Sequence, residues 1–127
     1  MAHPHAPQFL ALVESVRPQV NECNISDLKT KIEMSSGASN FYLVDVREDN
    51  EFAAGHIPGA IHIGKGVIER DIEAAISNPD AEIYLYCGGG FRSVLAADAL
   101  KKMGYNNLTS VDGGWRGWVS AGYPTTK

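Results

Sequence analysis

Short apolar runs recur along the chain, and each is separated from the next by a segment with helical character. The runs are FYLVDV (41–46), AIHI (60–63), IYLY (83–86) and LTSVD (108–112), and each has the length of a strand. The intervening segments are EDNEFAAG (48–55), KGVIERDIEAAI (65–76) and SVLAADALKKMG (93–104). Continuous apolar strands alternating with helices are typical of a parallel sheet covered on both faces. The pattern predicts a three-layer α/β domain with a mainly parallel sheet of about five strands and helices on both faces.

The first segment of the chain is amphipathic and precedes the first of these strands. In PQFLALVESVRPQV, apolar residues such as Phe9, Val13 and Val16 recur near helical spacing, and Pro18 is expected to kink or end the helix. We therefore expect an N-terminal helical extension over residues 1–20 and one α/β domain over residues 21–127.

A second helix is expected before the first strand. Ser26 and Asp27 have the chemistry of an N-cap and first turn, and the helix should run to about Met34. Residues 35–40 are predicted to form a loop.

Composition limits the classes of function. The chain has 127 residues, of which 44% are hydrophobic and 20% charged, as expected for one globular domain. No apolar run approaches the roughly 20 residues of a membrane span, and the first residues lack the features of a secretory signal, so we expect a cytoplasmic protein with no membrane partner. The formal net charge of -4 disfavours nucleic-acid binding and requires that an anionic substrate be attracted locally.

The stretch YCGGGFRS (86–93) concentrates unusual chemistry at the end of an apolar run. Cys87 offers a thiol, which becomes a strong nucleophile only as the thiolate. The glycines can expose successive amide groups, the helix expected from Ser93 places its N-terminus here, and Arg92 adds a forked cationic donor. Taken separately, these residues could be a core residue, a tight turn and a surface arginine, but their combination favours a reactive cysteine in an anion-binding loop.

The cysteine count favours a reduced protein without a metal site. Cys23 and Cys87 are the only cysteines, which gives neither a disulfide framework nor a closely spaced zinc ligand pair. A disulfide between them is allowed by spacing but disfavoured by the reactive surroundings of Cys87, and Cys23 is expected to be structural. His3, His5 and His62 are too scattered to form a metal site. No cofactor is expected.

Several motifs occur in an order that resembles the single-domain rhodaneses, a family of sulfurtransferases. They are LVDVRE followed by EF, GHIPGAIHI, YCGGGFRS with AADAL and MGY, and DGGWRGW with AGYP. The resemblance implies that Cys87 accepts a sulfane sulfur from a small anionic donor, becomes a persulfide, and passes the sulfur to cyanide or to a thiol, with a protein acceptor also conceivable. It leaves the donor open among thiosulfate, a mercaptopyruvate-like compound and a low-molecular-weight persulfide.

The resemblance also assigns the loop residues to substrate binding. These residues are Gly88, Gly89, Gly90, Phe91, Arg92 and Ser93. One position departs from the family, because many members have a basic residue immediately after the cysteine and Gly88 stands there in this chain. The loop itself therefore lacks one stabilising charge.

Three further residues are expected to support the site. Asp45 and Arg47 follow the strand FYLVDV, and Asp45 is expected to accept hydrogen bonds from the loop amides or from Arg92. Arg47 is expected to pair with Glu48 or Glu51. The resemblance places Trp115 at the entrance of the loop as an apolar wall.

Two other classes of function remain as alternatives. The same pocket would serve a non-catalytic module that senses persulfides or binds a partner, although such a module has no chemical need for the thiol. A cysteine phosphatase or arsenate reductase is the weaker alternative. The four residues GGGF between Cys87 and Arg92 make a loop one residue shorter than that of cysteine phosphatases, and a shorter loop should exclude phosphate.

Overall fold

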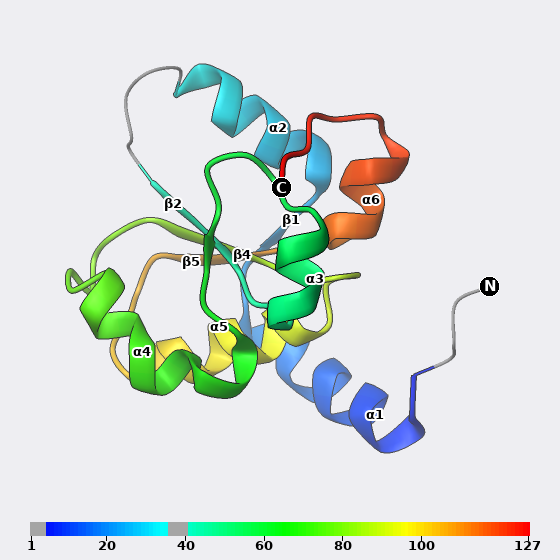
Figure 1. The fold of residues 1–127 in the computed structure, drawn as a ribbon. Coiled ribbons are helices and arrows are strands. Elements are labelled where there is room, and N and C mark those ends of the chain that lie inside the picture. The colour runs from blue at the N-terminus through cyan, green and yellow to red at the C-terminus, as the bar shows by residue number, and fades with distance from the viewer. Residues whose placement is uncertain (1–4, 36–40) are drawn as a thin grey trace.

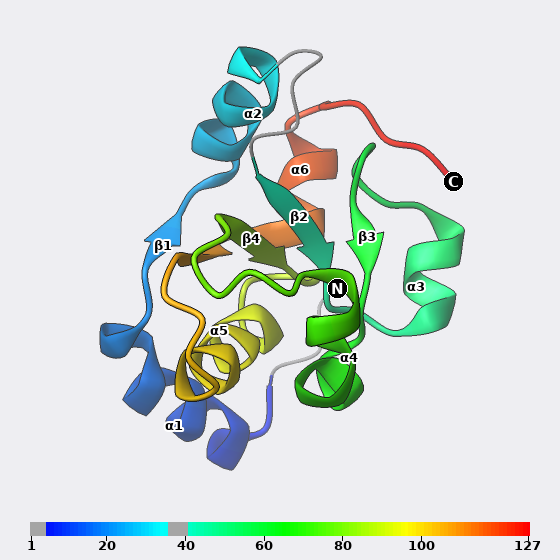
Figure 2. The same ribbon diagram turned by 90° about the vertical axis from the view of Figure 1, so that its left-hand side faces the viewer.

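The computed structural model describes residues 5–35 and 41–127 and shows three layers (Figures 1 and 2). Helices α4 and α5 cover one face of the sheet, with α1 packed against α5, and α2 and α6 cover the other, so helices lie on both faces as predicted. The helices are α1 (Pro7–Val16), α2 (Ile25–Met34), α3 (Asp49–Ala54), α4 (Ile68–Ala75), α5 (Arg92–Lys102) and α6 (Gly114–Ser120), with 3-10 turns at Arg17–Gln19 and Lys65–Val67. Most of the predicted loop at 35–40 lies outside the described residues.

The sheet has five strands in the order β1-β5-β4-β2-β3, and every neighbouring pair is parallel. The strands are β1 (Glu22–Cys23), β2 (Tyr42–Asp45), β3 (Ile61–His62), β4 (Ile83–Tyr86) and β5 (Leu108–Val111). The predicted parallel α/β architecture is confirmed. Only β1 was not assigned from the sequence, since two residues at the edge of a sheet leave no apolar pattern.

Successive side chains of each strand point to opposite faces of the sheet, so the core is divided into two clusters. Val44 and Leu85 pack with Ile68 and Ile72 of α4 on one face. Leu43, Tyr86 and Val111 pack with Leu28 of α2 and Trp118 of α6 on the other. Both faces of the sheet are therefore closed, and the strand ends are left to carry the polar chemistry.

The helix ends follow local signals, with one correction. Helix α1 ends at Val16, before Pro18, as predicted. The N-cap of α2 is Asn24 and not Ser26 or Asp27. Asn24 Oδ1 accepts the Asp27 amide at 2.8 Å, and Asp27 Oδ2 accepts the Asn24 amide at 3.3 Å. This reciprocal capping box fixes the start of α2 at Ile25.

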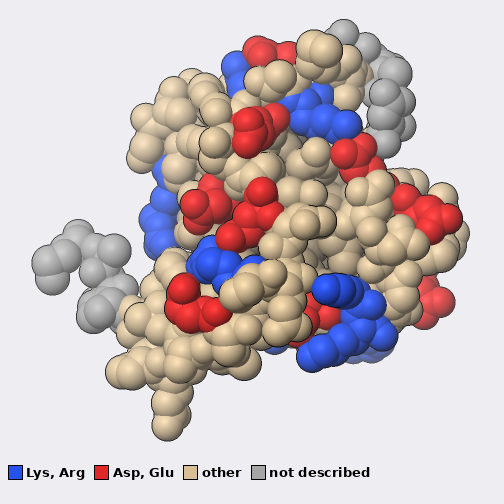
Figure 3. Space-filling view, turned by 180° about the vertical axis from the view of Figure 1, so that it is seen from behind, with Lys and Arg blue, Asp and Glu red and all other residues tan. Residues whose placement is uncertain are grey.

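The charged surface and the lengths of the helices complete the description of the fold. Figure 3 shows acidic and basic side chains intermingled on the face seen from behind, where the described residues present no continuous basic surface. None of the helices in the described part of the chain is long and apolar enough to cross a membrane.

Candidate active site

Cys87 immediately follows β4, at the carboxyl end of the sheet. Asp45 at the end of β2 is in register with Tyr86, and the Val46 amide donates to the Tyr86 carbonyl at 2.9 Å. The two strand ends that the sequence predicted to carry the polar residues therefore lie side by side.

The sulfur of Cys87 is enclosed but has polar neighbours. The residue is 1% exposed, and the Gly90 amide donates to Sγ at 3.1 Å. On the inner side, Sγ lies 3.6 Å from Ser93 Oγ, which shares a 2.8 Å hydrogen bond with Ser110 Oγ. Ser93 is fully buried beside the sulfur, and its contact with substrate stays a prediction.

The start of α6 holds the loop through backbone hydrogen bonds. The Trp115 amide donates to the Cys87 carbonyl at 2.8 Å, and the Arg116 amide donates to the Gly88 carbonyl at 3.0 Å. Gly114, with φ of +50°, approaches so closely that a Cβ there would overlap the Cys87 carbonyl. The DGGW stretch therefore fixes the shape of a loop more than twenty residues away in sequence.

Arg92 begins α5 and is bound to Glu51 of α3. Its Nη1 donates to Glu51 Oε1 at 2.8 Å and its Nη2 to Oε2 at 3.2 Å, a bidentate pair. Hydrogen bonding to Glu51 raises the pKa of Arg92, so the guanidinium stays charged. Glu51 was expected to pair with Arg47, but it instead orients Arg92.

The pair predicts a pH-dependent contribution to stability. Hydrogen bonding from Arg92 lowers the pKa of Glu51 below its ordinary 4.5, so the contribution is present above pH 4.5 and is lost as the pH falls through the lower folded-state pKa. Because both side chains are about one-third exposed, we expect Glu51→Gln to lower the free energy of unfolding by about 1 kcal/mol or less at pH 7. The difference in the free energy of unfolding between the variant and the parent should vanish in acid. Urea titrations from neutral to acid pH measure this difference, and a difference that grew in acid would contradict the stabilising role of the pair.

A pocket of about 260 Å³ adjoins the sulfur. It is lined by His5, Phe9, Cys87, Gly88, Gly89, Phe91, Arg92 and Arg116. Cys87 and four of the predicted loop residues thus line one pocket, while Gly90 is buried beside Asp112 and takes a φ of +98°. Substrate binding by the pocket residues stays a prediction.

Arg116 is a pocket residue that the sequence analysis missed. Its guanidinium lies over the loop so closely that a Cβ on Gly89 would overlap Nη2. A Cβ on Gly88 would lie 3.1 Å from Arg92 Nη2 and 4.0 Å from Arg116 Nη1, so both guanidinium groups flank Gly88. The charge that the loop lacks after Cys87 is therefore supplied by α6. The signal was available in DGGWRGW, because a helix starting after β5 begins beside the end of β4.

Asp45 and Arg47 form a buried ion pair with each other and not the predicted contacts. Arg47 Nη2 donates to Asp45 Oδ2 at 2.7 Å and to the Gly55 carbonyl at 2.6 Å, and the Arg47 amide donates to Asp45 Oδ1 at 2.9 Å. The expected bonds from Asp45 to the loop or to Arg92, and from Arg47 to Glu48 or Glu51, are wrong. With Arg47 3% exposed, the pair braces the end of β2 from within.

Trp115 packs against Arg47 and Gly55. Its ring packs on the Arg47 guanidinium at 4.7 Å and beside Gly55. It is not among the residues that line the pocket, where Phe91 lies with His5 and Phe9 of the extension. The ring of His56 stacks on Phe52, and its Nδ1 lies 3.0 Å from the Phe52 carbonyl, so His56 packs as a structural residue.

Both cysteines are free thiols, and Cys23 is unsuited to nucleophilic chemistry. Burial, assisted by Asp27 and Asp112, raises the pKa of Cys23 to about 11. Cys23 therefore stays protonated near neutrality and serves as a control for the reactivity of Cys87.

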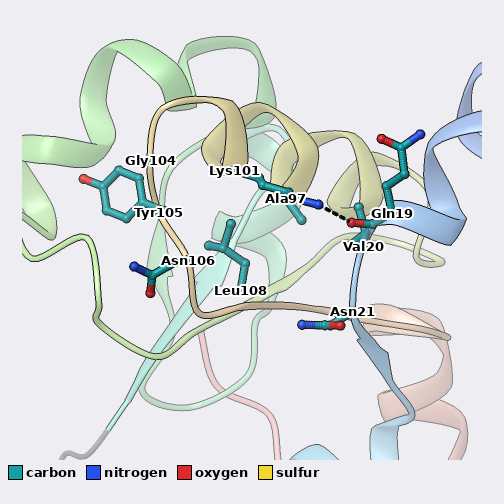
Figure 4. Close-up of a pocket in the computed structure, with 9 residues that line it drawn as sticks. All are labelled: Gln19, Val20, Asn21, Ala97, Lys101, Gly104, Tyr105, Asn106 and Leu108. Atoms are coloured by element: carbon teal, nitrogen blue, oxygen red, sulfur yellow. Dashed lines mark hydrogen bonds between the residues drawn. The ribbon is translucent and has the colours of Figure 1, made fainter.

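A second pocket, of about 410 Å³, lies at the other end of the strands (Figure 4). It is formed by the residues after α1, the end of α5 and the start of β5, where Lys101 Nζ donates to the Gln19 carbonyl at 3.0 Å. Its lining includes no cysteine, whereas the candidate nucleophile Cys87 lines the smaller pocket.

Comparison with known proteins identifies the family of the chain. The model of the rhodanese-like domain matches residues 25–121, and the chain belongs to that family. YtwF of Bacillus subtilis, provisionally named a sulfurtransferase, is 36% identical over 100 residues, 79% of this chain and 91% of YtwF. The thiosulfate sulfurtransferase GlpE of Pseudomonas entomophila is 37% identical over 87 residues, 68% of this chain and 77% of GlpE. These relatives support sulfur transfer as the general activity.

Two other similar proteins differ from YtwF and GlpE in length or in the function that their names suggest. The chain spans about half of YrkF of Bacillus subtilis, provisionally named a sulfur carrier protein, with 34% identity over 100 residues, 79% of this chain and 51% of YrkF. A Rhodopseudomonas palustris structure, RPA3614, has a TM-score of 0.83 and 27% identity, with 99% of both chains covered. RPA3614 is described as a protein of unknown function and a possible tyrosine phosphatase. The full coverage means that the match includes the N-terminal extension.

Proposed function

We propose that the protein transfers sulfane sulfur through a persulfide on Cys87. With thiosulfate as donor, the Cys87 thiolate attacks the outer sulfur, a new S–S bond forms on Cys87, and the donor S–S bond breaks to release sulfite. The two negative charges of thiosulfate are then carried by sulfite, and the negative charge of the thiolate passes to the outer persulfide sulfur.

The second half returns the enzyme to its starting state. Cyanide, or a thiolate, attacks the outer sulfur of the persulfide, and the S–S bond on Cys87 breaks to restore the thiolate. The products are thiocyanate from cyanide or a new persulfide from a thiolate. No cofactor enters either half, because each step exchanges one bond to sulfur for another.

The observation that carries this proposal is the convergence of positive groups on one enclosed sulfur. The Gly90 amide contacts Sγ at 3.1 Å, and the guanidinium groups of Arg92 and Arg116 border the same pocket. These groups stabilise an anionic sulfur and attract an anionic donor. The names of YtwF and GlpE support the same chemistry.

The test is direct observation of the intermediate. After incubation with thiosulfate, we expect intact mass spectrometry to show one added sulfur, on the parent and on Cys23→Ser alike. Addition of cyanide should remove the sulfur and yield an equal amount of thiocyanate. No adduct from thiosulfate, a mercaptopyruvate-like donor or a low-molecular-weight persulfide would favour the binding module and overturn the proposal.

The description of RPA3614 makes phosphatase activity the second candidate function. The loop argues against it, because GGGF is one residue shorter than the phosphate loop of cysteine phosphatases. Hydrolysis of an aryl phosphate that depends on Cys87, without sulfur transfer, would reverse this ranking.

A further inference from the structure

The N-terminal extension reaches the pocket that contains Cys87. His5 precedes α1, Phe9 lies in its first turn, and both line the pocket. The ring centroids of His5 and Phe91 are 4.3 Å apart, and those of His5 and Phe9 are 5.4 Å apart. The three rings therefore form one aromatic surface beside the reactive sulfur.

Packing and charge hold the extension in this position. Val13 is fully buried, and α1 lies against α5. The Arg17 guanidinium lies 5.6 Å from the centroid of the Phe91 ring and pairs with Glu14 at 3.2 Å and Glu22 at 2.5 Å. The aromatic surface is thus anchored to the domain at several points.

The other side of the pocket is cationic, and Arg116 is its available charge. Arg92 already binds Glu51 through both of its terminal nitrogens. Within residues 5–35 and 41–127, Arg116 forms no ion pair with a carboxylate. An anionic group entering the pocket would therefore meet an uncompensated guanidinium.

We propose that the extension is part of the active site, and that His5 and Phe9 join Phe91 in an aromatic wall that selects organic sulfane-sulfur compounds. Arg116 binds the anionic group of the same compounds. Thiosulfate has no apolar surface and gains nothing from aromatic rings, whereas an organic body in contact with them gains affinity. This specificity rests on the proposed sulfur transfer, which itself needs no aromatic wall.

Thiosulfonate anions provide a matched test of the wall. Methanethiosulfonate and benzenethiosulfonate have the same charge and the same reacting sulfur. They differ only in the organic group, which is a methyl in the first and a phenyl in the second. In either case the Cys87 thiolate takes the outer sulfur, the donor S–S bond breaks, and a sulfinate leaves with the electron pair of that bond. Thiocyanate formation with cyanide as acceptor gives kcat/KM for each donor.

We expect the parent to prefer the phenyl donor, and Phe9→Ala or His5→Ala to lower the phenyl-to-methyl ratio of kcat/KM about three- to tenfold. Phe9→Leu keeps an apolar side chain on α1 and should lower the ratio less. Leu12→Ala is the control on the same helix, because Leu12 is 52% exposed and lines a different pocket. Arg116→Met should lower kcat/KM for both donors and leave the ratio unchanged.

Alkylation separates failure of this proposal from failure of sulfur transfer. The rates of alkylation of Cys87 are measured in the Cys23→Ser background. The first ratio, the rate with N-phenyl iodoacetamide divided by the rate with iodoacetamide, reports the aromatic wall. The second ratio, the rate with iodoacetate divided by the rate with iodoacetamide, reports the charge of Arg116. We expect the first rate ratio to fall in Phe9→Ala and the second in Arg116→Met. Folded variants with unchanged ratios would overturn the aromatic wall and the anion site, whatever the outcome with thiosulfate.

Discussion

Cys87→Ser is expected to abolish sulfur transfer, with at least about a thousandfold loss of thiocyanate formation. A serine hydroxyl does not ionise near neutrality and cannot carry the transferred sulfur. The fold should survive, because the hydroxyl can accept from the Gly90 amide and bond Ser93, the two partners of Sγ. We expect the free energy of unfolding to change by no more than about 2 kcal/mol.

Cys23→Ser is the matched control for this loss. Cys23 lies outside the pocket, and its raised pKa of about 11 keeps the thiol protonated, so the variant should retain the parent rate. Turnover by Cys87→Ser, or loss of turnover in Cys23→Ser with an intact fold, would place the nucleophile elsewhere.

Gly114→Ala is expected to have the second largest effect, although Gly114 touches no substrate. Its φ of +50° disfavours a side chain, and the added Cβ would collide with the Cys87 carbonyl, which is backbone and cannot turn aside. The loop must shift, so we expect about 3 kcal/mol of destabilisation and roughly a hundredfold lower kcat. Urea unfolding and thiocyanate formation measure the two effects.

Gly122→Ala is the control that separates the effect of backbone strain from the effect of a steric collision of the added Cβ. Gly122 also has a positive φ, of +75°, but no atom lies within 4 Å of the position of its Cβ. This variant should lose only about 1 kcal/mol of stability and keep its activity. If the folded fraction of Gly114→Ala transferred sulfur at the parent rate, α6 would not determine the shape of the loop.

The layers, which the structure confirms, and the candidate nucleophile Cys87 could both be predicted because they depend on local patterns. Apolar runs identified β2 to β5, and the loop chemistry around Cys87 needs only neighbouring residues. The places of Arg116 and His5 at the pocket were missed, and Glu51 was assigned to Arg47, because these residues reach the loop from other elements and their positions depend on helix packing.

The errors at Asp45 and Arg47 have a similar origin. A strand-end carboxylate beside an active loop suggested hydrogen bonds across the sheet. Arg47, only two residues away, folds back and occupies both oxygens of Asp45. Trp115 was misplaced because the sequence does not say which side of α6 faces the pocket.

The position of His5 also matters for how the protein is produced. A purification tag fused ahead of the extension would begin within a few residues of the mouth of the pocket. The opposite end of the chain is bound elsewhere, since Thr126 pairs with His56 through two backbone hydrogen bonds of 2.9 and 3.0 Å. Kinetic work on this enzyme is therefore better served by a carboxy-terminal tag, or by one cleaved without leaving residues behind.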